Sequence, residues 1–397
     1  MDDDVLAPAS VWRKPMLARH SDEEHRTSTP LELFFDLCFV VAVAQAAVGL
    51  HHAVGEGHVA DGVLDYLLVF FAIWWAWMNF TWFASAYDTD DVAYRLTTLV
   101  QIAGALVFAA GVPPALDHRD FAVITAGYVL MRLAMVTQWL RAARDDPPRR
   151  GCCRRYALGV TVVQVGWVLR LALPTGWDLA GFGVLAVAEL AVPLWAERGT
   201  STTWHRQHIA ERYGLFTMIV LGESVLSATL AVQAAADLEG SWVVLASTAV
   251  GGMLTVFAMW WLYFSKDAGS VLTSQRTAFV WGYGHYAVFA SAAAVGAGLA
   301  VIADTAGNAP EHLTDTAATA SFTVPVAVFL LAVGFLHWRP HHLTRRHTAL
   351  APAFALAVLA ATFVPEPVLV TGILLAVLVA VGVVTGRDAL TPGRSRA

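Results

Sequence analysis

The chain has 397 residues, of which 57% are hydrophobic and 14% are charged, and its formal net charge is −6. Soluble proteins carry about 25% charged residues, so this composition excludes an ordinary soluble domain. The apolar residues lie in continuous runs of about 20, the length that crosses roughly 30 Å of hydrocarbon as a helix. Apolar and polar residues do not alternate within these runs, which argues against membrane-spanning β-strands. Lipid offers the backbone no hydrogen-bond partners, so we expect transmembrane helices.

Twelve such helices are predicted in chain order. Their ranges are 29–50, 63–86, 92–113, 120–140, 155–173, 178–196, 212–232, 242–264, 277–302, 319–337, 348–364 and 367–386. Residues 1–28 are expected to form a cytoplasmic leader and residues 388–397 a cytoplasmic tail. The predicted domains between them are a first six-helix half, 29–198, and a second, 199–387.

The positive charges predict the orientation of these helices. Of the 25 lysine and arginine residues, 22 fall in the leader, the tail and alternate connections, whereas the opposite connections contain only Arg119 and are otherwise acidic. Lysine and arginine accumulate in cytoplasmic loops. We therefore expect an all-α polytopic membrane protein with both termini cytoplasmic.

Similar landmarks in the two halves suggest an internal repeat. Arg26 precedes Asp36 by ten residues, and Arg212 precedes Glu223 by eleven. With six helices each, the halves share one orientation, which predicts the parallel-repeat arrangement found in transporters.

Ionisable residues within the apolar runs are the candidate site. A charge at the membrane centre costs roughly 2.5–3.5 kcal/mol on insertion scales, so it usually serves a function. Glu32 and Asp36 are one helical turn apart and share a face of the first helix. The residues expected to bind a proton, a cation or a substrate are Asp36, Glu223, Glu32, Arg132, Glu189 and His285. The structural alternatives are an ion pair of Arg132 with Asp36 or Glu189, an interhelical hydrogen bond at Glu223, and a packing role for His285.

No soluble catalytic or nucleotide-binding motif is visible, so energy from bound ATP is not expected. The three cysteines lack metal-ligand spacing and are predicted to be free thiols. The histidines of the first outer loop lack the fixed spacing of a metal site. Neither a metal nor a cofactor is expected.

Two long strings resemble the bacterial low temperature requirement A (LtrA) family. They are TPLELFFDLCFVVAVAQ at Thr29–Gln45 and HIAERYGLFTMIVLGES at His208–Ser224. The resemblance implies a multi-pass protein of the bacterial inner membrane that is linked to growth at low temperature. It marks Glu32, Asp36, His208, Glu211, Arg212 and Glu223 as signature positions.

The signature residues before the seventh helix suggest a cytoplasmic gate. We expect His208, Glu211 and Arg212 to seal this face together with Asp88 and Asp91, although a solvated turn with helix capping is the simpler interpretation of the two aspartates.

Three functions are compatible with these features. The first is a secondary transporter, coupled to protons or a cation; its expected partners are membrane lipids, a small solute and the coupling ion, and no nucleic acid. The alternatives are a non-transport envelope or cold-stress protein and a membrane-embedded, lipid-active enzyme.

Overall fold

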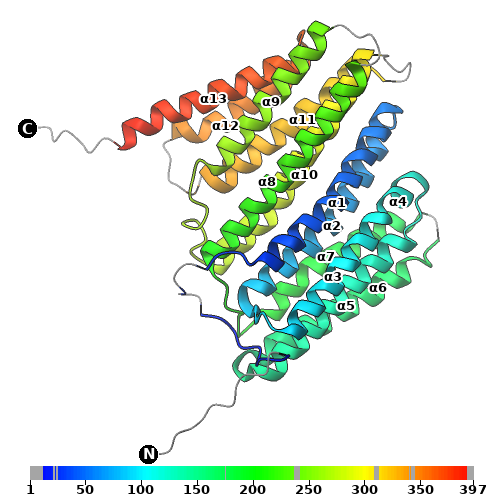
Figure 1. Ribbon diagram of the computed structural model, residues 1–397, viewed down its shortest axis with the longest axis vertical. Coiled ribbons are helices and arrows are strands. Elements are labelled where there is room, and N and C mark those ends of the chain that lie inside the picture. The colour runs from blue at the N-terminus through cyan, green and yellow to red at the C-terminus, as the bar shows by residue number, and fades with distance from the viewer. Residues whose placement is uncertain are drawn as a thin grey trace, which may run out of the picture. The chain divides into compact units, whose positions relative to one another are not determined.

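The computed structural model describes residues 12–20, 23, 26–174, 176–236, 242–307, 313–338, 340 and 345–390. The regular structure of these residues is entirely helical (Figure 1). The first helices are α1 (Pro30–Gly55), α2 (Val59–Tyr87), α3 (Val92–Ala110), α4 (Val112–His118), α5 (Ala122–Asp145), α6 (Arg150–Arg170) and α7 (Asp178–Ala196). They are followed by α8 (Arg206–Ala236), α9 (Trp242–Phe264), α10 (Gln275–Gly307), α11 (Asp315–Val333), α12 (Arg345–Ala361) and α13 (Pro367–Leu390). A short 3-10 helix, η1 (Pro147–Arg149), precedes α6, and a π-helix, η2 (Gly334–Trp338), continues α11.

Each of the twelve predicted ranges overlaps one of these helices. Within the described residues, nine helices are long and apolar enough to cross a membrane, and α12 contributes a shorter apolar stretch. The structure therefore supports a polytopic membrane protein, while the count of twelve spans and the N-in/C-in orientation remain predictions.

The chain forms two compact units. Unit 1 comprises Met1–Ala46 and Leu68–Tyr213, and unit 2 comprises Ala47–Leu67 and Gly214–Ala397. Helices α1, α2 and α8 therefore contribute residues to both units. The predicted halves, 29–198 and 199–387, and their internal repeat remain predictions.

In unit 1, α3 packs on α5, α5 on α6, and α6 on α7. Glycines permit the first of these contacts. A Cβ atom on Gly127 would lie 2.3 Å from the backbone nitrogen of Phe108, and one on Gly104 would lie 2.7 Å from Cγ of Met131. Small residues at such positions let helix backbones approach closely, as is common in membrane proteins.

In unit 2, α10 packs on α11 and α9 on α13, while α12 contacts both α11 and α13. Here too a glycine lies at the contact: a Cβ atom on Gly251 of α9 would lie 2.5 Å from the backbone nitrogen of Leu369 in α13.

Within unit 1, the described part of the leader is held against the helices by hydrogen bonds from its backbone amides. The amide of Lys14 donates to Asp91 (2.6 Å), that of Met16 to Asp145 (3.1 Å), and that of Arg19 to the carbonyl of Ala86 (2.9 Å). The leader therefore covers the ends of α2 and α5 and the start of α3.

Candidate functional site

The first turn of α1 is fixed by a reciprocal capping interaction. The backbone amide of Thr29 donates to Oε2 of Glu32 (2.8 Å), and the amide of Glu32 donates to Oγ1 of Thr29 (3.3 Å). This Thr-x-x-Glu arrangement satisfies two amides that a helix start otherwise leaves unpaired. It holds the Glu32 side chain, which is fully buried, at the start of the helix.

Asp36 lies one turn further along α1 and is also fully buried. Its carboxylate accepts hydrogen bonds from Nη2 (2.6 Å) and Nε (3.0 Å) of Arg212 in α8. A third hydrogen bond comes from Nε1 of Trp77 in α2 (2.7 Å). The two-pronged guanidinium contact is the geometry in which arginine binds a carboxylate most specifically.

Helix α8 supplies the arginine and histidine side chains that contact these carboxylates. Nη1 of Arg212 lies 3.1 Å from Oε1 of Glu32, and Nε2 of His208 lies 3.1 Å from the same oxygen. His208 and Arg212 are four residues apart, as are Glu32 and Asp36, so each helix presents its pair on one face. We call these four residues, all with exposure below 1%, the buried ionic site.

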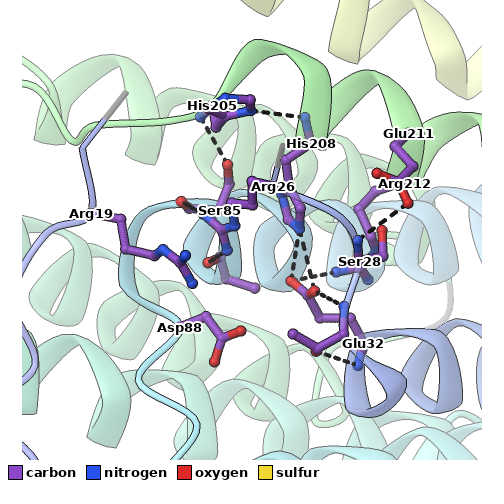
Figure 2. Close-up of polar contacts among 12 residues, drawn as sticks. Arg19, Arg26, Ser28, Glu32, Ser85, Asp88, His205, His208, Glu211 and Arg212 are labelled. Atoms are coloured by element: carbon purple, nitrogen blue, oxygen red, sulfur yellow. Dashed lines mark hydrogen bonds and ion pairs between the residues drawn. The ribbon is translucent and has the colours of Figure 1, made fainter. Parts of the chain in front are cut away.

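A second histidine orients the start of α8. Nε2 of His205 lies 2.8 Å from the carbonyl oxygen of Glu23, which can only accept, so Nε2 carries the proton. Nδ1 of His205 then accepts from the backbone amide of His208 (3.2 Å), and the His205 amide donates to Oγ of Ser85 (3.0 Å). Figure 2 shows His205 with Ser85 and His208, beside the Glu32–His208 pair.

Arginine residues of the leader surround the end of α2 (Figure 2). The guanidinium of Arg26 is buried and donates to the carbonyl oxygens of Ser85 and, at 2.6 Å, of Ala84. It therefore satisfies carbonyls of the last helical turn, where the helix dipole also favours a cation.

Asp88 follows the end of α2 and is 8% exposed. Its Oδ1 accepts from the backbone amide of Asp90 (3.0 Å). Burial, reinforced by the negative charge of Glu32, raises the pKa of Asp88 to about 6, although Arg26 and Arg19 oppose this shift.

The residues expected to form one gate have different partners in the structure. Asp91 caps α3 by accepting the amide of Tyr94 (2.8 Å), and it pairs with Arg141 of α5. Burial alone would raise the pKa of Asp91. The hydrogen bonds that it accepts from Arg141 and from the Lys14 amide outweigh burial, so the pKa of Asp91 lies below its usual value. Glu211 accepts the backbone amide of Ser28 (3.2 Å). The capping part of the alternative interpretation therefore describes the contact of Asp91 with Tyr94, but both aspartates are buried, so the turn is not solvated. The gate itself remains a prediction.

Glu189 of α7 is the centre of a separate buried cluster in unit 1. Its Oε2 accepts from Nη2 of Arg132 and Nε1 of Trp75, both at 2.8 Å. Its Oε1 accepts from the hydroxyl of Tyr128 (2.8 Å). Two further donors from α6, Gln164 (3.1 Å) and Trp167 (3.3 Å), complete the set. Arg132 therefore pairs with Glu189, one of the two partners considered from the sequence, and this cluster fastens α7 to α2, α5 and α6.

The remaining candidates lie in unit 2. Glu223 of α8 is only partly buried, whereas its neighbour Ser224 is buried and donates to the carbonyl of Ala292 (2.8 Å). A joint role of Asp36 and Glu223 remains a prediction.

His285 belongs to a buried aromatic cluster in unit 2. Nδ1 of His285 lies 2.7 Å from the carbonyl of Trp281 and therefore carries a proton. If the ring is neutral, Nε2 accepts from the hydroxyl of Tyr263, 3.0 Å away. His337 of η2 approaches Nε2 to 3.5 Å. These contacts are compatible with either the packing or the proton-transfer role considered for His285.

Sequence reasoning missed Trp77, His205 and the structural role of Arg26. The spacing of His205, His208 and Arg212, three and then four residues, was the available signal, because it places all three on one face of a helix. No group of three or more histidine, cysteine, aspartate or glutamate side chains suited to a metal occurs among the described residues.

Residues 27–383 match the family model described as "Bacterial low temperature requirement A protein (LtrA)". The chain is also 28% identical over 293 residues to an uncharacterized protein of Rhizobium meliloti (strain 1021), an alignment that covers 68% of each chain. The family match includes all four residues of the buried ionic site.

Proposed function

Since this chain belongs to the LtrA family and is a multi-pass membrane protein, we propose that it is a secondary transporter of the bacterial inner membrane, coupled to protons or a cation. Twelve spans in two parallel six-helix halves, with both termini cytoplasmic, are part of this proposal. Its transported solute is a small molecule.

The charge balance of the buried ionic site carries the proposal. Two carboxylates, Glu32 and Asp36, share a single guanidinium, and arginine does not lose its proton in proteins. With His208 neutral, the four residues hold a net charge of −1. An uncompensated charge in a buried position is costly. One proton or one monovalent cation would bring these four residues to neutrality.

Binding of that charge would also change the contact between helices. A proton on Asp36 removes the negative charge that attracts Arg212, and a proton on Glu32 weakens both of its contacts with α8. A ligand shifts a conformational equilibrium only through its different affinity for the two states. Protonation would therefore favour a conformation in which the contact between α1 and the start of α8 is weaker.

The test is reconstitution of the protein into liposomes that contain a pH-sensitive dye, followed by a screen of small solutes. We expect at least one solute gradient to move protons, and Asp36→Asn or Glu32→Gln to abolish the coupled signal. Arg95→Gln, which removes an exposed pair with Asp90, is the control and should leave the signal intact. If a cation is the coupling ion, the signal should follow its gradient instead. The proposal fails if no solute moves an ion and both carboxylate variants retain function in cells.

A non-transport role is the second candidate. It is favoured by the number of hydrogen bonds that the buried carboxylates already accept. Asp36 accepts three hydrogen bonds and Glu189 accepts five. Such carboxylates also serve to fix helices in place. If this role is correct, any Asp36 variant that folds normally should still support growth at low temperature, whether or not position 36 carries a charge.

A further inference from the structure

A cavity of about 480 Å³ lies entirely within unit 2. Its walls are the end of α1 and the start of α2 on one side and α10 and α11 on the other. Ligand-binding cavities typically measure about 300–1,000 Å³. We refer to this space as the apolar groove.

Small side chains on α10 make the groove hollow. Along this helix the wall is formed largely by alanine and glycine, at Ala287, Ala290, Ala294, Ala297 and Gly298. These spacings of three, four, three and one residues keep the small side chains on one face of the helix.

The polar side chains of the groove are already engaged. The hydroxyl of Tyr66 donates to the carbonyl of Ala290 (2.6 Å), and that of Tyr286 donates to the carbonyl of Leu67 (2.8 Å). Ser291 and Ser321 likewise donate to carbonyls within their own helices. A polar solute that entered the groove would lose its hydrogen bonds to water and gain few new ones. An apolar ligand would not have this cost.

The groove opens along an apolar surface formed by candidate membrane spans. Val63, Leu67, Val324 and Val328 line it and remain 38–44% exposed. The four helices that form it, α1, α2, α10 and α11, are all candidate membrane spans. In a bilayer, such a surface would face the hydrocarbon of the lipid tails.

The length and polarity of the groove fit one acyl chain. From Ala317 to Val328 the α11 wall extends about 16 Å at 1.5 Å per residue, close to one leaflet, which is about half of the roughly 30 Å hydrocarbon core. The end nearest the α1–α2 turn is marked by a polar contact between Nε2 of His51 and Oδ2 of Asp304 (2.7 Å). The opposite end, near Leu67 and Tyr286, is apolar.

We propose that the apolar groove binds one acyl chain of a bilayer phospholipid, with the lipid headgroup at the level of the His51–Asp304 pair. This binding site is independent of the buried ionic site, which lies in unit 1.

The test uses the full chain in phosphatidylcholine vesicles that contain a phospholipid with a diazirine in its acyl chain. After irradiation, the labelled peptides are identified by mass spectrometry. We expect label on the α10 and α11 segments that line the groove. Val328→Trp and Ala294→Phe should each reduce it several-fold by filling the space.

Leu331→Trp is the matched control, because Leu331 is an exposed residue of α11 that does not line the groove. It should leave the labelling unchanged. Val328 is itself exposed, so its replacement tests the groove even if Ala294→Phe impairs folding; helix content by circular dichroism checks each variant. Unchanged labelling in Val328→Trp, or equal labelling around Leu331 and the groove, would overturn the proposal. Absence of lipid label together with cross-links between two copies of the chain would show that protein covers the groove and would overturn it as well.

Discussion

Glu32 takes part in two interactions at once. Its carboxylate closes the capping interaction with Thr29 and also contacts Arg212 and His208. The start of α1 and the start of α8 therefore depend on the same side chain. A change of charge at Glu32 would affect both the helix cap and the ion pairs.

Arg212→Gln should strongly destabilise the protein, because it leaves two buried carboxylates without their shared cation. Loss of one partner of a buried pair typically costs about 3–5 kcal/mol. Thermal unfolding in detergent, followed by circular dichroism, measures the effect. Arg95→Gln serves as the comparison: its partner Asp90 is half exposed, so only a small change is expected. Equal effects of the two substitutions would contradict this account.

Asp88 should make stability depend on pH. Its pKa rises from the usual 3.8 to about 6 in the folded protein, so the folded state favours the protonated form. This contribution to stability is complete below about pH 4 and is lost as the pH rises through about 6. Asp88→Asn should therefore gain stability over the wild type, by at most about 3 kcal/mol, at neutral pH but not at low pH.

The control for Asp88 is Asp90→Asn. The hydrogen bond from Arg95 lowers the pKa of Asp90, so its contribution is present above about pH 4 and is lost as the pH falls. Unfolding midpoints measured across this pH range should show opposite trends for the two variants. Parallel trends would show that Asp88 is not buried as described.

Among the elements of unit 1, α7 carries a buried carboxylate that contacts three other helices. Donors from α2, α5 and α6 all converge on Glu189. The position of the helix thus depends on this polar cluster as well as on its apolar contacts.

Glu189→Ala should cost about 3–5 kcal/mol, because Arg132 would be left buried without its partner. Replacing both residues with apolar side chains, Arg132→Met and Glu189→Leu, should cost less than Glu189→Ala alone. The unfolding midpoints of the two variants provide the measurement. A double variant that is less stable than Glu189→Ala would show that the hydrogen bonds themselves stabilise α7.

Gly127→Ala should separate α3 from α5, because the added Cβ atom would lie 2.3 Å from backbone of Phe108. We expect a loss of about 1–3 kcal/mol, as for other overpacked contacts. Gly183→Ala in α7 is the matched control, since a Cβ atom there meets nothing within 4 Å. Alanine favours helices over glycine, so this control should be neutral or slightly stabilising. Thermal unfolding of both variants distinguishes the outcomes.

Local patterns predicted the helices well but could not identify the partners across them. Hydropathy located the helices, and the four-residue spacing placed Glu32 and Asp36 on one face. Their partner Arg212 lies 176 residues beyond Asp36 in the sequence, and no local rule joins two residues so far apart. The acidic charge of Asp91 suggested a gate, but its contact with Arg141 depends on how α3 packs against α5.

For the molecule as a whole, the family match and the apolar helices establish a multi-pass membrane protein. The three cysteines are buried and free, so a new surface cysteine can be labelled selectively. This property permits a direct test of the proposed orientation.

A membrane-impermeant maleimide should label Glu56→Cys in intact spheroplasts but should label Arg95→Cys only after the membrane is permeabilised. Glu56 lies in a predicted outer loop and Arg95 on the predicted cytoplasmic side, and both side chains are more than half exposed. The unmodified protein is the background control. Labelling of Arg95→Cys without permeabilisation would contradict cytoplasmic termini.

The division of α1 and α2 between the units has a consequence for biosynthesis. Residues 47–67 belong to unit 2, and they form hydrogen bonds with Tyr286, Ala290 and Asp304 of α10. At about 5–20 residues per second, a ribosome needs on the order of 10–50 s to reach α10 after completing this segment. During that interval residues 47–67, at the α1–α2 turn, lack their contacts with α10. A ribosome-bound nascent chain that ends before α10 should therefore be the form of this protein most dependent on insertion chaperones.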